Sequence, residues 1–116
     1  MPKKIMWFSR HDIIPSELRE LRRLYGYDVQ IVKDPKPFSN ADDIIRRYKA
    51  SDADDLLVVA PLSVFAALTE RGIHPLYAQM RQVYPPERGE VNVNGRLFVF
   101  ERFQRVKRVA LEFEDI

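Results

Sequence analysis

Residues 56–60, Leu-Leu-Val-Val-Ala, form an uninterrupted apolar run that ends at Pro61. A strand with one face in water alternates apolar and polar residues, whereas a strand covered on both faces is apolar throughout. This run therefore predicts a central strand of a parallel sheet with helices packed on both sides. Parallel neighbours need crossover connections, which are right-handed in nearly all proteins.

The first 84 residues fit this expectation, because short apolar runs alternate with amphipathic segments. Strands are expected at 3–9, 27–32, 54–60 and 73–80, and helices at 15–26, 39–50 and 61–72. Pro15 suits the first turn of the first helix, Gly26 suits its end, and Ser39 or Asn40 suits the N-cap of the second. The order strand, helix, strand, helix, strand, helix, strand is typical of an α/β fold.

Residues 85–116 have a different character. Asn94-Gly95 is a strong signal for a two-residue hairpin turn, and the residues from Arg96 onward are rich in aromatic and β-branched side chains. We therefore predict one Rossmann-like α/β domain over 1–116, with a mostly parallel sheet and three helices in 1–84 and an antiparallel β-hairpin extension in 85–116. A lone hairpin is barely stable in water, so it must pack on the sheet edge, on the helices or on a second copy. Its apolar content favours a homodimer formed through this C-terminal β segment.

Composition narrows the classes of partner and site. The formal net charge is +2, so no strong field requires a nucleic-acid or membrane partner, and we expect no duplex nucleic acid. The basic strand 102–108 is interpreted as a charged edge that discourages aggregation, with binding to nucleic acid as the alternative. No apolar stretch reaches the ~20 residues that cross a bilayer, and no signal peptide is recognisable, so we expect a cytoplasmic protein without a membrane partner.

The sequence lacks the residues and motifs that several common kinds of site require. The chain has no cysteine, and its two histidines lie far apart in the sequence, so we expect neither a disulfide nor a metal site. The sequence contains no GxGxxG, no GxxxxGK[ST] and no GxSxG. Dinucleotide or ATP use of the usual kinds is therefore disfavoured, and we expect no cofactor.

The segment Met6–His11, MWFSRH, is the main candidate for a site, because its apolar run stops at three polar residues. In open parallel sheets, ligands bind beyond the carboxyl ends of the strands. Arg10 can hold a phosphate, Ser9 can donate a hydrogen bond, and His11 can transfer a proton near neutral pH. The alternative is structural: Arg10 is solvated, and His11 and Asp12 form a simple turn or cap.

Two further residues are expected at the same edge. Ser63 falls in the first turn of the third helix, and Arg81 follows the fourth predicted strand. Both are candidate ligand-binding residues, Ser63 through its hydroxyl beside free helix amides and Arg81 through its charge. Helix initiation for Ser63 and surface solvation for Arg81 are the alternatives.

The same segments carry a resemblance. The order MWFSRH, IIPSELRELRRLYG, LLVVAPLSVFAAL and GIHPLYAQM, closing with FERFQRV, resembles small uncharacterised Rossmann-like proteins of bacterial and mobile-element genomes. These look in turn like the small CRISPR-associated ring-nuclease families. The resemblance implies a dimeric protein that binds or cleaves cyclic oligoadenylate at the carboxyl ends of its parallel strands. Cleavage would be metal-independent attack of a ribose 2′-hydroxyl on the adjacent phosphate, with His11 as the catalytic residue.

The sequence departs from that pattern at one position and leaves alternatives open. The family pattern has a threonine before the proline, where this chain has Ile14, which cannot cap the helix. Either Asp12 replaces that cap or the cap is lost. Beside the ring nuclease, a non-catalytic nucleotide or second-messenger binding module and a structural or protein-interaction dimer without ligand remain alternatives.

Overall fold

The structure is a computed structural model that describes residues 1–116. The strands are β1 (Lys4–Phe8), β2 (Gln30–Lys33), β3 (Asp55–Val58), β4 (Leu76–Val83), β5 (Val91–Val93) and β6 (Arg96–Arg105). The helices are α1 (Pro15–Tyr25), α2 (Ala41–Ala50) and α3 (Leu62–Glu70). The predicted α/β class, the three helices and the order of the elements are confirmed. None of the helices has the length and apolar content needed to cross a membrane.

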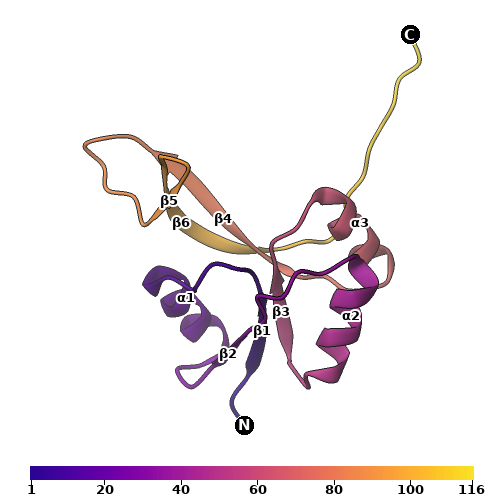
Figure 1. The fold of residues 1–116 in the computed structure, drawn as a ribbon, viewed down its shortest axis with the longest axis horizontal. Coiled ribbons are helices and arrows are strands. Elements are labelled where there is room, and N and C mark those ends of the chain that lie inside the picture. Colours follow the sequence, from indigo (N-terminus) through magenta and orange to yellow (C-terminus); the bar gives the residue numbers. More distant parts are fainter.

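All six strands form one mixed sheet in the order β2-β1-β3-β4-β6-β5 (Figure 1). The pairs β1–β2, β1–β3 and β3–β4 are parallel, and the pairs β4–β6 and β5–β6 are antiparallel. The chain runs from β1 outward to β2 on one side, and from β3 outward to β4 on the other. The direction of winding therefore reverses between the neighbours β1 and β3.

Helices cover both faces of the parallel strands. Trp7 and Leu57 pack with Leu21 of α1 on one face, whereas Phe8 and Val58 pack with α2 and α3 on the other. Adjacent residues of β1 and β3 thus serve opposite cores, as strand alternation requires. All four residues of β3 are buried, which confirms the central strand expected from the apolar run.

Local sequence signals place the turns and caps. The side chain of Asn40 accepts a hydrogen bond from the backbone N–H of Asp43 at 3.0 Å, so Asn40 caps α2. Asn94 and Gly95 have positive φ angles of 52° and 82°, as a type I′ hairpin turn between β5 and β6 requires. Both features agree with the sequence prediction.

The C-terminal strands form an arm that leaves the body of the protein. β4 pairs with β3 at only one position, Leu57 with Leu76, and then follows β6 away from β3 (Figure 1). The β4–β6 ladder shifts register between Gln79 and Met80, which marks a bulge where the arm bends. We use the name arm for residues 80–100.

The C-terminal β structure is shorter than expected. β6 ends at Arg105, the partner of Leu76, because the preceding Pro75 has no N–H with which to extend the ladder. The carbonyl of Pro75 still accepts a hydrogen bond from the Val106 N–H at 3.0 Å. Residues 106–116 form no strand, and the end of the chain extends away from the body (Figure 1).

One ion pair joins the end of β6 to the parallel strands. Asp55, the first residue of β3, is 8% exposed and accepts two hydrogen bonds from Arg105 at the end of β6, each 2.7 Å long. The hydroxyl of Tyr25, at the end of α1, donates a third hydrogen bond to Asp55 at 2.6 Å. Bidentate pairing fixes both the distance and the orientation of the two side chains. A helix, a central strand and the end of β6 therefore meet at one carboxylate.

The titration of this cluster agrees with its geometry. Burial acts to raise the pKa of Asp55, but the hydrogen bonds from Arg105, Tyr25 and the Leu56 N–H outweigh it, so this pKa lies below its ordinary value. Burial, together with the bond to the Asp55 carboxylate, raises the pKa of Tyr25 to about 12. A lowered carboxylate pKa adds stability at pH values above its ordinary range, and this contribution is lost as the pH falls through that range.

We expect Arg105→Ala to lower the free energy of unfolding by about 1–3 kcal/mol at pH 7. The substitution leaves a buried carboxylate without its cation, and the partial exposure of Arg105 reduces the cost below that of a fully buried pair. The effect shrinks below about pH 4, where Asp55 is protonated in the unfolded chain. Urea unfolding at several pH values measures it.

Arg102→Ala is the matched control, since Arg102 lies on the same strand and pairs only with its exposed neighbour Glu101. Hydrogen exchange adds a local measurement, because amide protons of β6 should exchange faster in Arg105→Ala than in the control. Equal unfolding free energies for the two variants would contradict a structural role for the Asp55–Arg105 pair.

Candidate functional site

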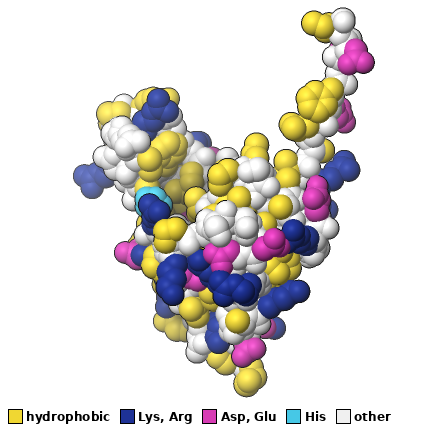
Figure 2. Space-filling view, turned by 45° about the vertical axis from the view of Figure 1, so that its right-hand side comes forward, with side chains coloured by type: hydrophobic (Ala, Val, Ile, Leu, Met, Phe, Trp, Pro, Cys, Tyr) yellow, Lys and Arg dark blue, Asp and Glu magenta, His cyan; other side chains and the backbone are white.

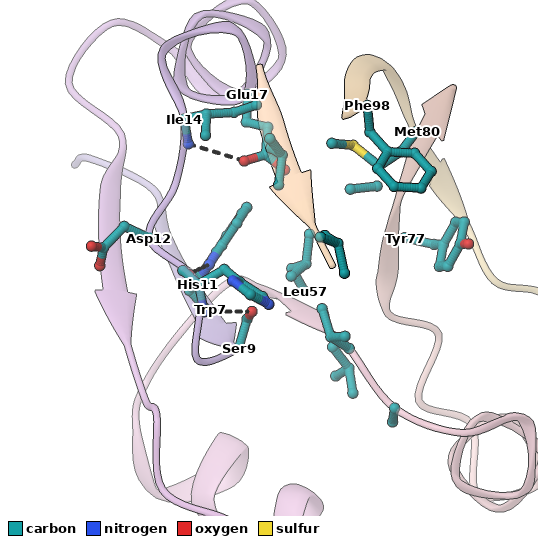
Figure 3. A pocket seen from close by; sticks show the side chains of 16 residues that line it. Trp7, Ser9, His11, Asp12, Ile14, Glu17, Leu57, Tyr77, Met80 and Phe98 are labelled. Atoms are coloured by element: carbon teal, nitrogen blue, oxygen red, sulfur yellow. Dashed lines mark hydrogen bonds between the residues drawn. The ribbon is translucent and has the colours of Figure 1, made fainter. Parts of the chain in front are cut away.

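A cleft of about 430 Å³ lies where β1 and β3 end. One wall is the loop from Ser9 to Ile14 with the start of α1, the floor is the end of β3, and the other wall is the arm (Figure 3). The cleft exists because β4 separates from β3 after a single paired position. Residues that follow β1 and β3 also line it, so it reaches the edge where the winding of the sheet reverses, which is where open α/β sheets bind ligands.

The lining of the cleft is mainly apolar. Twelve of its sixteen lining residues are hydrophobic, and they include aromatic rings from three strands, Trp7, Tyr77 and Phe98. Hydrophobic side chains gather in the hollow between the arm and the body (Figure 2). Four lining residues are polar or charged, namely Ser9, His11, Asp12 and Glu17. The cleft thus suits a flat, largely apolar group that is oriented by a few polar contacts.

The loop after β1 is held by its own hydrogen bonds. The hydroxyl oxygen of Ser9 accepts the His11 N–H at 3.1 Å, and the His11 carbonyl accepts the indole N–H of Trp7 at 2.9 Å. These two bonds fix the backbone of His11, and its ring lies in the cleft (Figure 3). The ring nitrogens bond to no group of the protein and are free to contact a ligand. Residues 9–11 thus form a bend at the mouth of the cleft, and the candidate roles of Ser9 and His11 stay predictions.

The other three predicted site residues lie outside the cleft lining. Arg10 is exposed beside His11 and forms no ion pair or hydrogen bond within the chain. Ser63 is exposed in the first turn of α3, which follows the cleft floor. Arg81 lies on the opposite face of the arm from its neighbour Met80, and its side chain is 3.6 Å from both Glu87 and Glu101. The structure therefore brings together Ser9 and His11, with Arg10 next to them, and it separates Arg81 from them.

Glu17 is a cleft residue that the sequence analysis did not single out. It is 7% exposed, and its Oε1 accepts the Ile14 N–H at 3.0 Å. This bond is one half of a capping box, and Ile14 has no oxygen with which to supply the other half. Asp12 does not replace the missing cap, because its carboxylate pairs with Lys33 at 2.6 Å. The cap on the Ile14 side is therefore lost, and Glu17 supplies the bond that remains.

A signal for Glu17 exists in the sequence. Glu17 lies four residues before Leu21 and eight before Tyr25, and so falls on the apolar stripe of α1. A glutamate at the third position of a helix, on the stripe that faces the core, is typical of a capping box. Without the fold, the sequence does not indicate that the arm encloses this position.

Burial alters the titration of Glu17. Desolvation raises the pKa of Glu17, the hydrogen bond from Ile14 opposes this effect, and the negative charge of Glu90 on the arm adds to it. The net result is a pKa above the ordinary value for glutamate. A raised carboxylate pKa means that the ionised form is less favourable in the folded protein than in the unfolded chain.

The two helix N-termini at this edge differ in charge. The carboxylate of Glu17 neutralises the positive end of α1. The first turn of α3 has neither an acidic residue nor a side-chain cap, so its N–H groups remain open. The positive potential on this edge therefore comes from α3 and from Arg10.

No protein-family model matches the chain, and no curated protein or solved structure is significantly similar to it. The resemblance to ring-nuclease families therefore stays a prediction. No three or more His, Asp or Glu side chains are grouped so as to hold a metal ion.

We expect Glu17→Gln to raise the melting temperature at pH 7. The glutamine side chain keeps a carbonyl oxygen that can accept the Ile14 N–H, since capping boxes use either Glu or Gln at this position. It also removes a carboxylate whose ionised form is disfavoured by burial. Because a raised carboxylate pKa costs stability only above the ordinary range, the gain should vanish near pH 4. Thermal unfolding followed by circular dichroism between pH 4 and pH 8 measures this.

Glu20→Gln is the matched control one turn along α1. Glu20 pairs with Arg23, which lowers its pKa, so this change should give no gain in melting temperature at pH 7. If Glu17→Gln is less stable than the wild type at every pH, the ionised carboxylate of Glu17 stabilises the fold, and burial does not make it costly.

Proposed function

We propose that the protein binds a small nucleotide in this cleft, with cyclic oligoadenylate as the first ligand class to test. The observation that carries the proposal is the position of His11 in an apolar, aromatic cleft at the carboxyl ends of β1 and β3. An aromatic cleft of about 430 Å³ is large enough for a nucleobase with its ribose. Base stacking on aromatic rings supplies binding energy for any base.

The phosphate is proposed to lie at the rim of the cleft. Arg10 is the unpaired cation beside His11, and a guanidinium can bind phosphate through two parallel hydrogen bonds. The open N-terminus of α3, with the Ser63 hydroxyl, offers further donors on the far side of the cleft floor. Arg81 has no part in this proposal, since it pairs with glutamates on the other face of the arm.

The strand order supports a Rossmann-like interpretation of the parallel part. The order β2-β1-β3-β4 with helices on both faces corresponds to the doubly wound sheets of the flavodoxin type. Those sheets bind their ligands at the carboxyl ends of the first and third strands, and the residues after β1 and β3 line part of this protein's cleft. We propose the Rossmann-like class for residues 1–84, with the antiparallel strands as an addition at the β4 edge.

Cleavage of the bound ring is a second candidate function, favoured by the free imidazole of His11 in the cleft. The ribose 2′-oxygen would attack the adjacent phosphorus and displace the 5′-oxygen of the next nucleotide. His11 would accept the proton of the 2′-hydroxyl or donate one to the leaving 5′-oxygen. The products would be a 2′,3′-cyclic phosphate and a 5′-hydroxyl, with no metal needed.

A homodimer formed through the C-terminal segment is part of the proposal. Leu111 and Phe113 are 79% and 89% exposed, and they alternate with Glu112 and Glu114 as in a strand with one apolar face. Large exposed apolar side chains in one segment mark an interaction site. A cyclic ligand is larger than one cleft, so a second subunit would provide contacts for its remaining nucleotides. The same segment also supports the alternative of an interaction dimer without ligand.

Direct binding tests the nucleotide proposal. We expect calorimetry with cyclic and linear oligoadenylates to show binding to the wild type, and Arg10→Ala to weaken it about 10-fold or more through loss of a charge-assisted contact. Arg19→Ala is the control, because Arg19 is exposed and unpaired on α1 and lies outside the cleft lining. Absence of binding to the wild type would exclude this function for the compounds tested.

Product analysis on the same ligands separates cleavage from binding. His11→Ala should abolish cleavage while binding is largely kept, whereas His74→Ala, at the opposite end of the sheet, should retain both. Cleavage that survives in His11→Ala would exclude His11 as the proton-transfer group. Binding without cleavage by the wild type would select the non-catalytic module.

Sedimentation analysis tests the dimer. The double substitution Leu111→Ser with Phe113→Ser should convert a wild-type dimer to a monomer, because it removes the apolar face of the segment. Substitution of Glu112 and Glu114 by Gln is the control on the polar face. A monomeric wild type at tens of micromolar would contradict the proposed dimer.

A further inference from the structure

We propose that Glu17 selects the ligand of the cleft by accepting a hydrogen bond from an amino group on a heteroaromatic ring. The preferred ligand class is therefore an amino-bearing base such as adenine, and the corresponding oxo-bearing base is rejected. This inference rests on the proposed function, because it requires that the cleft hold a nucleobase. It adds a specificity-determining residue that neither the sequence motifs nor the resemblance indicated.

The carboxylate of Glu17 has a fixed orientation. The Ile14 N–H holds Oε1 at 3.0 Å, so the side chain of Glu17 is tied to the start of α1. The other oxygen, Oε2, accepts no hydrogen bond within the protein, and the carboxylate is turned toward the cleft (Figure 3). A fixed acceptor with one free oxygen therefore lies in the cleft wall.

The free oxygen of Glu17 lies in apolar surroundings. The residues that the arm contributes to the cleft lining are all apolar, namely Met80, Val91, Val93 and Phe98. Glu90, the nearest charge on the arm, is also a carboxylate, and its Oε1 is occupied by the Phe100 N–H at 2.8 Å. Within the protein, no cation neutralises Glu17. A ligand that offers an N–H donor would satisfy Oε2 where water is partly excluded.

Adenine and hypoxanthine differ in the group that they would present to Glu17. Adenine carries an exocyclic amine, which donates to a carboxylate oxygen. Hypoxanthine is nearly isosteric with adenine but carries a carbonyl oxygen at the same position, and two acceptors facing each other in an apolar site repel. A site built to bond an N–H rejects the analogue that lacks it, because its buried polar group is left unpaired.

The test compares adenine and hypoxanthine ligands at pH 8, well above the ordinary pKa range of glutamate. Calorimetry would use cyclic tetra-adenylate and AMP, each beside its inosine counterpart. We expect the wild type to bind the adenine member of each pair about 10- to 100-fold more tightly, the range expected for one unpaired buried group.

Glu17→Gln provides the decisive variant. Its carbonyl replaces Oε1 on the Ile14 N–H, and its amide NH₂ then faces the cleft as a donor where Oε2 was an acceptor. The preference should fall to near unity or reverse in favour of inosine. A rotated glutamine could present its carbonyl to the cleft and so keep the preference for adenine. Glu17→Ala avoids this ambiguity, because alanine offers neither a donor nor an acceptor, and it should lose the preference without reversing it.

Glu20→Gln is the control for charge, since it makes the same change on α1 outside the cleft. It should keep the full preference for adenine. Folding of every variant is checked by circular dichroism before binding is measured.

The outcomes separate the two proposals. Equal affinity of the wild type for adenine and inosine ligands, or an unchanged preference in both Glu17 variants, overturns the role of Glu17 while nucleotide binding stands. Failure of the wild type to bind any of the four compounds overturns the proposed function and this inference with it.

Discussion

The bidentate pair between Asp55 and Arg105 holds together two parts of the sheet that share very little backbone pairing. β3 and β4 meet at one ladder position, which is too little to fix the direction of a long antiparallel arm. The ion pair, the Tyr25 hydroxyl and the bond from Val106 to Pro75 all act at the end of β4 where that position lies. Because the strands are joined at one end only, they separate at the other. The cleft is the direct consequence.

Opening the sheet in this way places chemically different groups on the two sides of one cavity. The β1 side carries the polar loop, with His11 held by backbone bonds and Arg10 exposed beside it. The arm supplies apolar and aromatic side chains, Phe98 among them, because the alternation of its strands turns Arg81 to the other face. A ligand with a flat apolar part and an anionic part matches this division, since each part meets a wall of its own kind.

Most of the fold was predictable because its signals are local. The apolar run 56–60, the Asn40 cap and the Asn94-Gly95 turn each determine structure within a few residues, and all three are confirmed. The site was predictable only on the β1 side, where strand and loop are contiguous. The arm wall and the Asp55–Arg105 pair depend on contacts across 50 residues of sequence, and periodicity carries no information about such partners. Glu17 is an intermediate case, because its position on the apolar stripe of α1 could be predicted from the sequence, whereas its enclosure by the arm could not.

The start of α1 fixes the carboxylate of Glu17 in the cleft wall. A threonine before Pro15 would accept an N–H of the first turn through its hydroxyl, and this bond would complete a capping box with the one that Glu17 accepts from residue 14. Ile14 instead contributes an apolar side chain to the cleft, and the Ile14 N–H binds Glu17. The cap and the carboxylate are thus one arrangement, in which the backbone fixes the acid and burial raises its pKa. Oε2 of this fixed carboxylate accepts no hydrogen bond within the protein and lines an apolar cleft, which is why we assign Glu17 a role in recognition.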